Sequence, residues 1–347
     1  MALARPRLSV VVPVYNDARN LAECLAALRA AEIPGCELIV VDDASPDDSA
    51  DVARRAGAMV ITLPQNSGPA AARNRGAAAA TGEILFFVDA DVAVAPDAIR
   101  RVADAFAADP EIAAVFGSYD DAPRAPGMVS QYRNLLHHWV HQQGNPEAST
   151  FWAGCGAVRR ATFLEVGGFD AGLFRRPAIE DIELGYRMRR RGYRIRLDKD
   201  LQGKHFKGWT LYSVIKTDIL SRAVPWSRLV LEGGGAPNDL NLKRGQRLSG
   251  LLVLLALAAL VLSPLRPLLL GLSAAALGAV VVLNWPLYRF LLARRGPWFL
   301  ARALPLHWLY YLYSSLTYLA IWIHVHARRG ARPMPAADAP APGRERA

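Results

Sequence analysis

The first ninety residues alternate between short apolar segments and helix-like segments, and this alternation restricts the possible folds more than any other feature of the chain. The apolar segments contain almost no polar residue, which is typical of strands buried on both faces of a parallel sheet. We expect strands at 8–14, 37–41, 60–63 and 84–88. Strands that alternate with helices in this way predict an α/β protein with a doubly wound, mostly parallel sheet.

Polar residues follow each of these four predicted strands. In an open parallel sheet, the carboxyl ends of the strands share one edge, and ligands bind at that edge. We therefore expect the four polar groups to lie together. They are Tyr15-Asn16, Asp42-Asp43, Gln65-Asn66 and Asp89-Ala90-Asp91.

Asp89 and Asp91 directly follow the fourth predicted strand. Side chains two apart in an extended backbone point the same way, so both carboxylates are expected to face one cation. Carboxylate oxygens suit Mg²⁺ or Mn²⁺ that also binds phosphate. The alternative is that the two aspartates only cap a turn. The convergence of four polar strand ends on one edge favours the metal site.

The helix that begins at Gly68-Pro69 should direct its first amides toward the same edge, where a diphosphate could bind. Arg73 lies one turn further along and could pair with that diphosphate, or it could be a solvated helix arginine. In a helix expected at 128–142, His137 and His141 also have the spacing of metal ligands, but no glutamate completes a His-Glu-x-x-His motif. We therefore expect them to be ordinary helix-surface or core histidines.

Charge and cysteine usage exclude several classes of protein. The formal net charge is +10 and 52% of the residues are hydrophobic, and basic stretches beside apolar runs indicate a membrane surface. No zinc finger, RNA-binding aromatic motif or basic helix-turn-helix pattern is found, so we expect no nucleic acid partner. The three cysteines lie far apart, which predicts neither a disulfide framework nor a zinc site. Pro13 interrupts the first apolar run, so we expect a cytoplasmic domain without a secretory signal.

An ordered set of motifs resembles family 2 glycosyltransferases of the GT-A fold, a nucleotide-diphospho-sugar transferase fold with a Rossmann-like, mostly parallel sheet. The resemblance covers roughly residues 7–210, and the order of the motifs makes it specific. The motifs are Val11-Val12-Pro13-Val14-Tyr15-Asn16, Val41-Asp42-Asp43-Ala44-Ser45, Ala72-Arg73-Asn74-x-Gly76, Asp89-Ala90-Asp91, Gly167-Gly168-Phe169-Asp170 and Glu180-Asp181.

The resemblance implies a set of residues that bind the nucleotide-sugar donor. Some of them would hold the base and ribose, Arg73 would lie near the diphosphate, and a glycine-containing loop would lie near the donor sugar and the acceptor. The implied donor-binding residues are Pro13, Tyr15, Asp43, Arg73, Asp89, Gly154 and Gly156.

The resemblance also implies a metal site and a catalytic base. Asp89 would contact ribose and metal, and Asp91 would bind the metal. His205 falls where many GT-A enzymes place a further metal-binding histidine, although it could be a surface histidine in a basic loop. Asp181 matches the family's catalytic base. The implied cofactor is Mn²⁺ or Mg²⁺.

The implied reaction is the inverting transfer of one sugar from a nucleotide-diphospho-sugar to a hydroxyl group. The cation stabilises the departing nucleotide, and Asp181 takes the proton of the acceptor. The Gln-x-x-Arg-Trp motif of processive synthases is missing, which favours a single transfer. A base suits a hydroxyl on a membrane lipid or lipid-linked saccharide. The alternatives are a polyprenyl-phosphate sugar synthase, whose acceptor is already ionised, and a non-catalytic nucleotide-sugar-binding membrane subunit.

Hydropathy divides the chain into four parts. We expect a catalytic domain at 1–208, an interfacial helix and connector at 209–247, a membrane region at 248–326 and a disordered tail at 327–347. Residues 209–226 have the pattern of an amphipathic helix on the bilayer, ended by Pro225, although a core helix of the catalytic domain is the alternative.

Three uncharged runs in the membrane region are each about as long as a spanning helix needs to be, roughly 20 residues. We expect spans at 248–265, 267–288 and 303–326, with the catalytic domain on the cytoplasmic side of an inner or plasma membrane. Arginines after the second run fit the positive-inside rule. The third run is rich in Trp and Tyr and could instead lie in the interface.

Overall fold

The structure is a computed structural model that describes residues 5–232 and 239–330. Within that part of the chain, eight strands form a sheet in the order β3-β2-β1-β4-β7-β6-β8-β5. The strands are β1 (Leu8–Val14), β2 (Glu37–Asp42), β3 (Met59–Thr62), β4 (Ile84–Val88), β5 (Val92–Val94), β6 (Ile112–Tyr119), β7 (Cys155–Arg159) and β8 (Arg194–His205).

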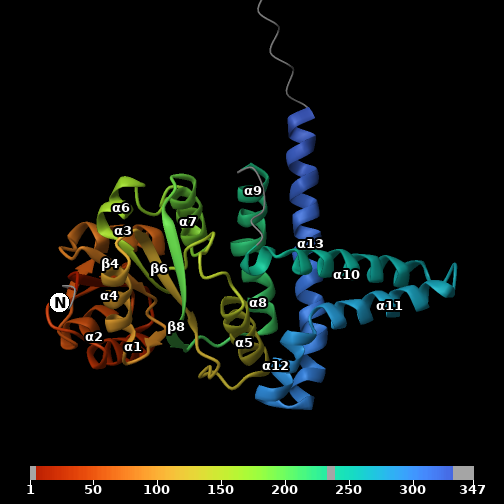
Figure 1. Cartoon of the computed structure of the whole chain (residues 1–347), viewed down its shortest axis with the longest axis horizontal. Coiled ribbons are helices and arrows are strands. Elements are labelled where there is room, and N and C mark those ends of the chain that lie inside the picture. Colours follow the sequence, from red (N-terminus) through yellow and green to blue (C-terminus); the bar gives the residue numbers. More distant parts are fainter. Residues whose placement is uncertain (1–4, 233–238, 331–347) are drawn as a thin grey trace, which may run out of the picture.

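Helices cover both faces of the sheet (Figure 1). They are α1 (Ala18–Ala30), α2 (Ser49–Arg55), α3 (Pro69–Ala79), α4 (Ala98–Ala108), α5 (Met128–Gln142), α6 (Arg160–Glu165) and α7 (Glu180–Arg190). Val10 and Val12 of β1 point into one core with α1 and α4, whereas Val11 points into the other with α3 and α5. Each of these valines is almost completely buried, as expected for a central strand.

The sheet mixes parallel and antiparallel pairs, and its central strand β7 runs against β4 and β6. β1, β2, β3 and β4 pair in parallel, as the sequence predicts, and β6 pairs in parallel with β8. Because β7 is reversed, its first residue, Cys155, pairs with Val88 at the last position of β4. The loop before β7 therefore lies at the same edge as the carboxyl ends of β1, β2, β4, β6 and β8.

A run of helices leads from the sheet to the carboxyl-terminal region. It consists of α8 (Leu211–Thr217), the π-helix η1 (Asp218–Ala223) and α9 (Val224–Glu232), followed after the undescribed segment by the short 3₁₀ helix η2 (Leu240–Leu242). The expected helix at 209–226 is therefore not one amphipathic α-helix. Pro225 does not end it, because that residue lies in the first turn of α9, which continues directly from η1.

Four helices form the carboxyl-terminal region: α10 (Arg244–Leu262), α11 (Leu268–Leu283), α12 (Trp285–Arg295) and α13 (Pro297–Gly330). α10 and α11 form a hairpin that extends away from the sheet, and the long helix α13 runs across its base (Figure 1). Many leucines of the hairpin are exposed, including Leu251, Leu255 and Leu268.

By length and composition, α10 is the one described helix that could cross a membrane alone. α11 and α12 would form a second span together, but they are bent by 71° across the break between them. The third expected span, 303–326, lies within the 34-residue helix α13, which does not meet the same criterion. The expected tail at 327–347 lies mostly outside the described residues.

Candidate active site

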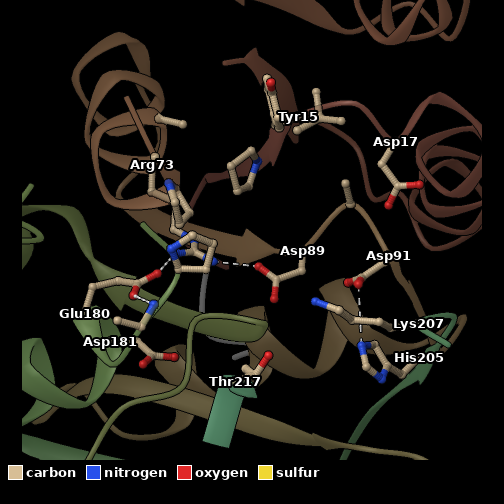
Figure 2. Close-up of a pocket in the computed structure, with 18 of the residues that line it drawn as sticks. Tyr15, Asp17, Arg73, Asp89, Asp91, Glu180, Asp181, His205, Lys207 and Thr217 are labelled. Atoms are coloured by element: carbon tan, nitrogen blue, oxygen red, sulfur yellow. Dashed lines mark hydrogen bonds and ion pairs between the residues drawn. The ribbon is translucent and has the colours of Figure 1, made fainter. Parts of the chain in front are cut away.

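A pocket of about 510 Å³ opens at the shared edge of the strands. Residues from distant parts of the sequence line it, among them Tyr15, Asp89, Asp181 and Thr217. Figure 2 shows Tyr15 at one end and Thr217 at the opposite end, with Asp89 and Asp91 between them. The predicted convergence of polar strand ends on one edge is thus observed for all four groups, which are represented in the pocket by Tyr15, Asp43, Asn66 and Asp89.

Asp89 and Asp91 both line the pocket, but not because the backbone there is extended. β4 ends at Val88, and the next residues form a turn in which the N–H of Val92 donates to the Asp89 carbonyl at 3.0 Å. The expectation that strand geometry aligns the two carboxylates was wrong. The turn brings them to one cavity instead, so the turn-capping and ligand-binding interpretations are not exclusive.

Asp91 and His205 face each other across the end of β8, with 3.5 Å between Asp91 Oδ2 and His205 Nε2. Burial would raise the pKa of Asp91, but the hydrogen bond and charge of His205 and the charge of Lys207 lower it overall. The imidazole of His205 also stacks on the ring of Tyr119, 4.1 Å between centroids. His205 is therefore a buried residue of the pocket and not a surface histidine.

The carboxylates and His205 fit a hard divalent cation that takes its remaining ligands from phosphate and water. Mg²⁺ and Mn²⁺ sites of this kind use one or two carboxylates together with substrate phosphates. Among the described residues, no three His, Cys, Asp or Glu side chains are close enough to form a metal site alone. His137 lines the pocket, and its ring centroid lies 4.1 Å from that of the buried His141, but no third such side chain completes a metal site with them among the described residues.

Arg73 is buried and joins two carboxylates at the pocket. Its Nη2 donates to Asp89 Oδ1 at 2.6 Å, and its Nη1 donates to Glu180 Oε1 at 2.8 Å (Figure 2). The alternative of a solvated helix arginine is wrong, because Arg73 is only 5% exposed. The guanidinium orients Asp89 directly and is close enough to the pocket to meet a diphosphate there.

Asp181 is a first-turn acid of α7 and is held by backbone N–H groups. Its Oδ2 accepts a hydrogen bond from Ala153 N at 3.0 Å, and its Oδ1 accepts one from Ile182 N at 2.8 Å. Burial and the neighbouring charge of Glu180 raise the pKa of Asp181 to about 7, against these hydrogen bonds and the charge of Arg73. A carboxyl with a pKa near neutrality is suited to accept a proton at physiological pH.

The loop before β7 contributes an aromatic ring to the pocket instead of bare backbone. A Cβ on Gly154 would lie 2.5 Å from the Trp152 ring, and a Cβ on Gly156 would lie 2.1 Å from the Trp152 carbonyl oxygen. The two glycines thus make room for Trp152, which lines the pocket and packs edge-on against Tyr119. Their proposed contact with the donor remains a prediction.

The end of the pocket near Tyr15 is built from the loops after β1 and β2. Asp43 accepts hydrogen bonds from Ser67 N and Gly68 N at 2.7 and 2.8 Å, which fixes the start of α3. Tyr15 is half exposed, and its neighbour Asn16 has a positive φ of 52°. Positive φ is uncommon outside glycine, and such backbone strain concentrates at ligand sites. Pro13 also lines this end.

The opposite end is formed by residues that the sequence did not single out for the site. Arg133 of α5 and Thr217 and Arg222 of the α8–η1 segment line it, together with Trp209. Sequence reasoning placed this segment on the bilayer because its apolar residues follow a helical period. Glu180, the partner of Arg73, was also missed, because acids at a helix start need no function to explain them.

The fold is similar to that of a solved structure, the mannosyltransferase PcManGT from Pyrobaculum calidifontis in complex with GDP-Man and Mn²⁺. The TM-score is 0.58 at 22% identity, and the match covers 91% of this chain and 88% of the other. The predicted α/β, GT-A-like fold is therefore confirmed, followed by carboxyl-terminal helices.

Residues 9–167 match the model of the family "Glycosyl transferase family 2". The match covers slightly less than half of the chain, and we call these residues the family 2 segment. The family 2 segment contains the aspartate turn, the Arg73 helix and the Trp152 loop, whereas Asp181 and His205 lie beyond the matched residues.

Two named relatives share the family 2 segment. The pre-mycofactocin glycosyltransferase of Mycobacterium tuberculosis is 31% identical over 200 residues, which is 55% of this chain and 41% of the relative. The validoxylamine A glucosyltransferase of Streptomyces hygroscopicus is 29% identical over 232 residues, 57% of this chain and 55% of the relative. The chain thus spans about half the length of these relatives.

Proposed function

We propose that the chain is a metal-dependent, inverting glycosyltransferase that moves a sugar from a nucleotide-diphospho-sugar to a hydroxyl of a membrane lipid or lipid-linked saccharide. One observation carries the proposal: Asp89, Asp91 and Asp181 line a single pocket at the ligand-binding edge of the sheet, although α7 is far from β4 in the sequence. The match of residues 9–167 to the family model supports it.

The residues that line the pocket have different roles in the proposed reaction. Pro13, Tyr15 and Asp43 would hold the base and ribose at one end of the pocket, and Asp89, Asp91 and His205 would hold Mn²⁺ or Mg²⁺. A bound divalent cation stabilises the negative charge that develops on a departing nucleotide. Arg73 orients Asp89 through the 2.6 Å hydrogen bond.

Asp181 acts as the general base. Its pKa of about 7 allows it to be ionised at neutral pH and to accept the proton of the acceptor hydroxyl. The backbone N–H of Ala153 and that of Ile182 fix the direction of the carboxylate. Attack on the face opposite the leaving nucleotide inverts the anomeric carbon.

The apolar hairpin of α10 and α11 supports anchoring in a membrane. α10 is long and apolar enough to cross, and its exposed leucines have no protein partner to cover them in the described residues. We place the protein in an inner or plasma membrane with the catalytic domain on the cytoplasmic side. Cell fractionation, together with a reporter fused to the amino terminus, tests this placement.

A donor-hydrolysis screen tests the proposed activity. UDP-, GDP- and dTDP-sugars are incubated with the full chain and Mn²⁺ or Mg²⁺, beside Asp91→Ala and the control Asp104→Ala. Asp104 is an exposed partner of Arg5 far from the pocket. We expect hydrolysis of one donor class by the wild type and the control, and its loss in Asp91→Ala or with a chelator. If no donor is hydrolysed or transferred, the chain is instead a non-catalytic nucleotide-sugar-binding subunit.

The acceptor class is tested with the same donor. A base-equipped site favours a hydroxyl, so Asp181→Asn should retain donor binding and lose transfer. If the protein instead glycosylates a polyprenyl phosphate and ignores hydroxyl acceptors, the alternative of a polyprenyl-phosphate sugar synthase is correct.

A further inference from the structure

Two arginines at the Thr217 end of the pocket share one carboxylate. Arg133 Nη2 and Arg222 Nη1 donate to the same oxygen, Asp218 Oδ1, at 2.9 and 2.6 Å. The second oxygen, Asp218 Oδ2, accepts a hydrogen bond from the hydroxyl of Tyr313 at 2.6 Å. Both carboxylate oxygens of Asp218 thus accept hydrogen bonds from protein side chains. Asp218 is almost completely buried and does not line the pocket itself.

The arginine pair carries more positive charge than Asp218 neutralises. Arg133 and Arg222 line the pocket, and within the described residues their hydrogen bonds end only on Asp218. Each guanidinium has five N–H donors, so each keeps donors beyond the one that binds Asp218. Burial lowers the pKa of Arg222, and the charge of Arg133 lowers it further against the attraction of Asp218. A bound anion would relieve this repulsion.

One further cation, Lys207, lies over the same aromatic ring as Arg222. Lys207 lies over the Trp209 ring with its Nζ 4.6 Å from the centroid, and Arg222 lies over the same ring at 5.9 Å. Lys207 and Trp209 also line the pocket. Planar guanidinium groups bind phosphate through two parallel hydrogen bonds, which makes a phosphate the best-matched anion.

The position of the arginine pair indicates which phosphate it binds. Thr217, which directly precedes Asp218, lies across the pocket from Tyr15 and on the side of Asp181 (Figure 2). The arginine pair therefore lies at the end of the pocket opposite the proposed nucleotide site near Tyr15. Tyr313 also connects Asp218 to α13, the long helix beside the apolar hairpin (Figure 1). The π-helical turn that carries Asp218 and Arg222 is a rare element that often occurs at functional sites.

We infer that Arg133 and Arg222, held in place by Asp218, bind the phosphate group of a phosphate-bearing lipid acceptor. This inference rests on the proposed glycosyltransferase function, because it assigns the acceptor end of the same pocket. In keeping with the proposed hydroxyl acceptor, this phosphate belongs to a lipid-linked saccharide or phospholipid whose hydroxyl attacks.

Binding measurements on the full chain in detergent test the inference without requiring transfer. The probes are farnesyl phosphate and farnesol, which differ only in the phosphate, and UDP or GDP with Mn²⁺ for the donor end. The variants are Arg222→Gln, Arg222→Lys and the control Arg101→Gln. Arg101 is an arginine of α4 that pairs with Asp97 outside the pocket.

We expect the wild type to bind farnesyl phosphate more tightly than farnesol. Arg222→Gln should weaken the binding of farnesyl phosphate by about 10- to 100-fold, the usual effect of losing hydrogen bonds to a charged group. Arg222→Lys should have a smaller effect because it keeps the charge without the planar fork. Farnesol and nucleoside diphosphate binding should be unchanged in every variant.

Three outcomes would overturn the inference. Equal binding of farnesyl phosphate and farnesol by the wild type would show that no phosphate is recognised. Weaker UDP or GDP binding in Arg222→Lys would assign the arginines to the donor phosphates. Full farnesyl phosphate affinity in both Arg222 variants would exclude Arg222. If Arg222→Gln does not fold, two comparisons still test the inference. They are the binding of farnesyl phosphate against farnesol by the wild type, and the binding of UDP or GDP by Arg222→Lys. If no donor is hydrolysed but the protein still binds farnesyl phosphate more tightly than farnesol, the proposed glycosyltransferase activity is refuted and the phosphate site is not.

Discussion

Arg73 of α3 and Glu180 of α7 form a buried ion pair, with 2.8 Å between Arg73 Nη1 and Glu180 Oε1 and both side chains less than a tenth exposed. The pair joins two helices that are far apart in the sequence, and the same guanidinium also binds Asp89. The aspartate turn and the start of α7 are thereby held in one fixed relation. Arg73 therefore contributes both to the stability of the fold, through Glu180, and to the proposed donor site, through Asp89.

Replacing Arg73 should therefore reduce stability as well as activity. Arg73→Gln would leave Glu180 buried without its cation, and breaking a buried pair in this way costs about 3–5 kcal/mol. The measurement is the free energy of unfolding from denaturant titration of the full chain. Arg54→Gln is the matched control, since Arg54 pairs with Asp51 on the exposed surface and its loss should matter little. Equal stability of the two variants would contradict the prediction.

Transfer should depend on the ionisation of Asp181. Because the base must be deprotonated and its pKa is raised to about 7, kcat/KM should increase as the pH rises through about 7. Asp181→Asn should remove this acidic limb and lower the rate by about 10²- to 10⁴-fold, as is usual for loss of a general base. Donor binding should persist. An unchanged pH profile in this variant would assign the limb to another group.

His205 should contribute to the metal dependence. His205→Gln should raise the Mn²⁺ concentration needed for half-maximal donor hydrolysis by about 10- to 100-fold, the effect of losing a ligand or the partner that orients one. The 3.5 Å contact with Asp91 makes both roles possible, and titration of activity with Mn²⁺ measures their sum. Unaltered metal dependence with reduced stability would mean that His205 serves only to pack on Tyr119.

Gly156 should not tolerate a side chain. In Gly156→Ala the new Cβ would meet the Trp152 carbonyl oxygen and the Phe151 ring, so we expect loss of the folded state or displacement of Trp152. Gly245→Ala is the control, because nothing lies within 4 Å of a Cβ there and alanine favours the helix. Thermal unfolding and tryptophan fluorescence of both variants give the comparison. A wild-type transition for Gly156→Ala would contradict the close approach of backbone at this position.

The sequence is informative where a short segment determines its own structure. β1, β4 and α5 have the predicted bounds, and the bounds of β2 and β3 differ from the predicted ones by a residue. Each carries its signal locally, as a run of apolar residues or a helical period. The GT-A-like fold could be predicted for the same reason, since the motifs at the strand ends occur in a fixed order.

Other parts of the site depend on contacts between distant segments. Nothing local indicates that β7 enters the sheet in reverse, that Arg73 pairs with Glu180, or that the segment after Trp209 closes the pocket. The amphipathic pattern of 209–226 was interpreted as a membrane-facing helix, but the packing of η1 and α9 against α13 uses the same pattern. The bend between α11 and α12 was missed because a continuous apolar run shows that a segment can be buried in lipid but not whether its helix is straight.

The reversal of β7 has a consequence for how such a site can diversify. β6 ends at Tyr119 and β7 begins at Cys155, and both positions lie at the pocket edge of the sheet. The segment between them, which includes α5 and Trp152, leaves the sheet after β6, touches β8 through a bridge between Glu147 and Arg196, and rejoins the sheet at β7. The parts of this segment outside the bridge can be lengthened or replaced without changing the order of any strand, which would let the proposed acceptor end vary while the proposed nucleotide end stays constant.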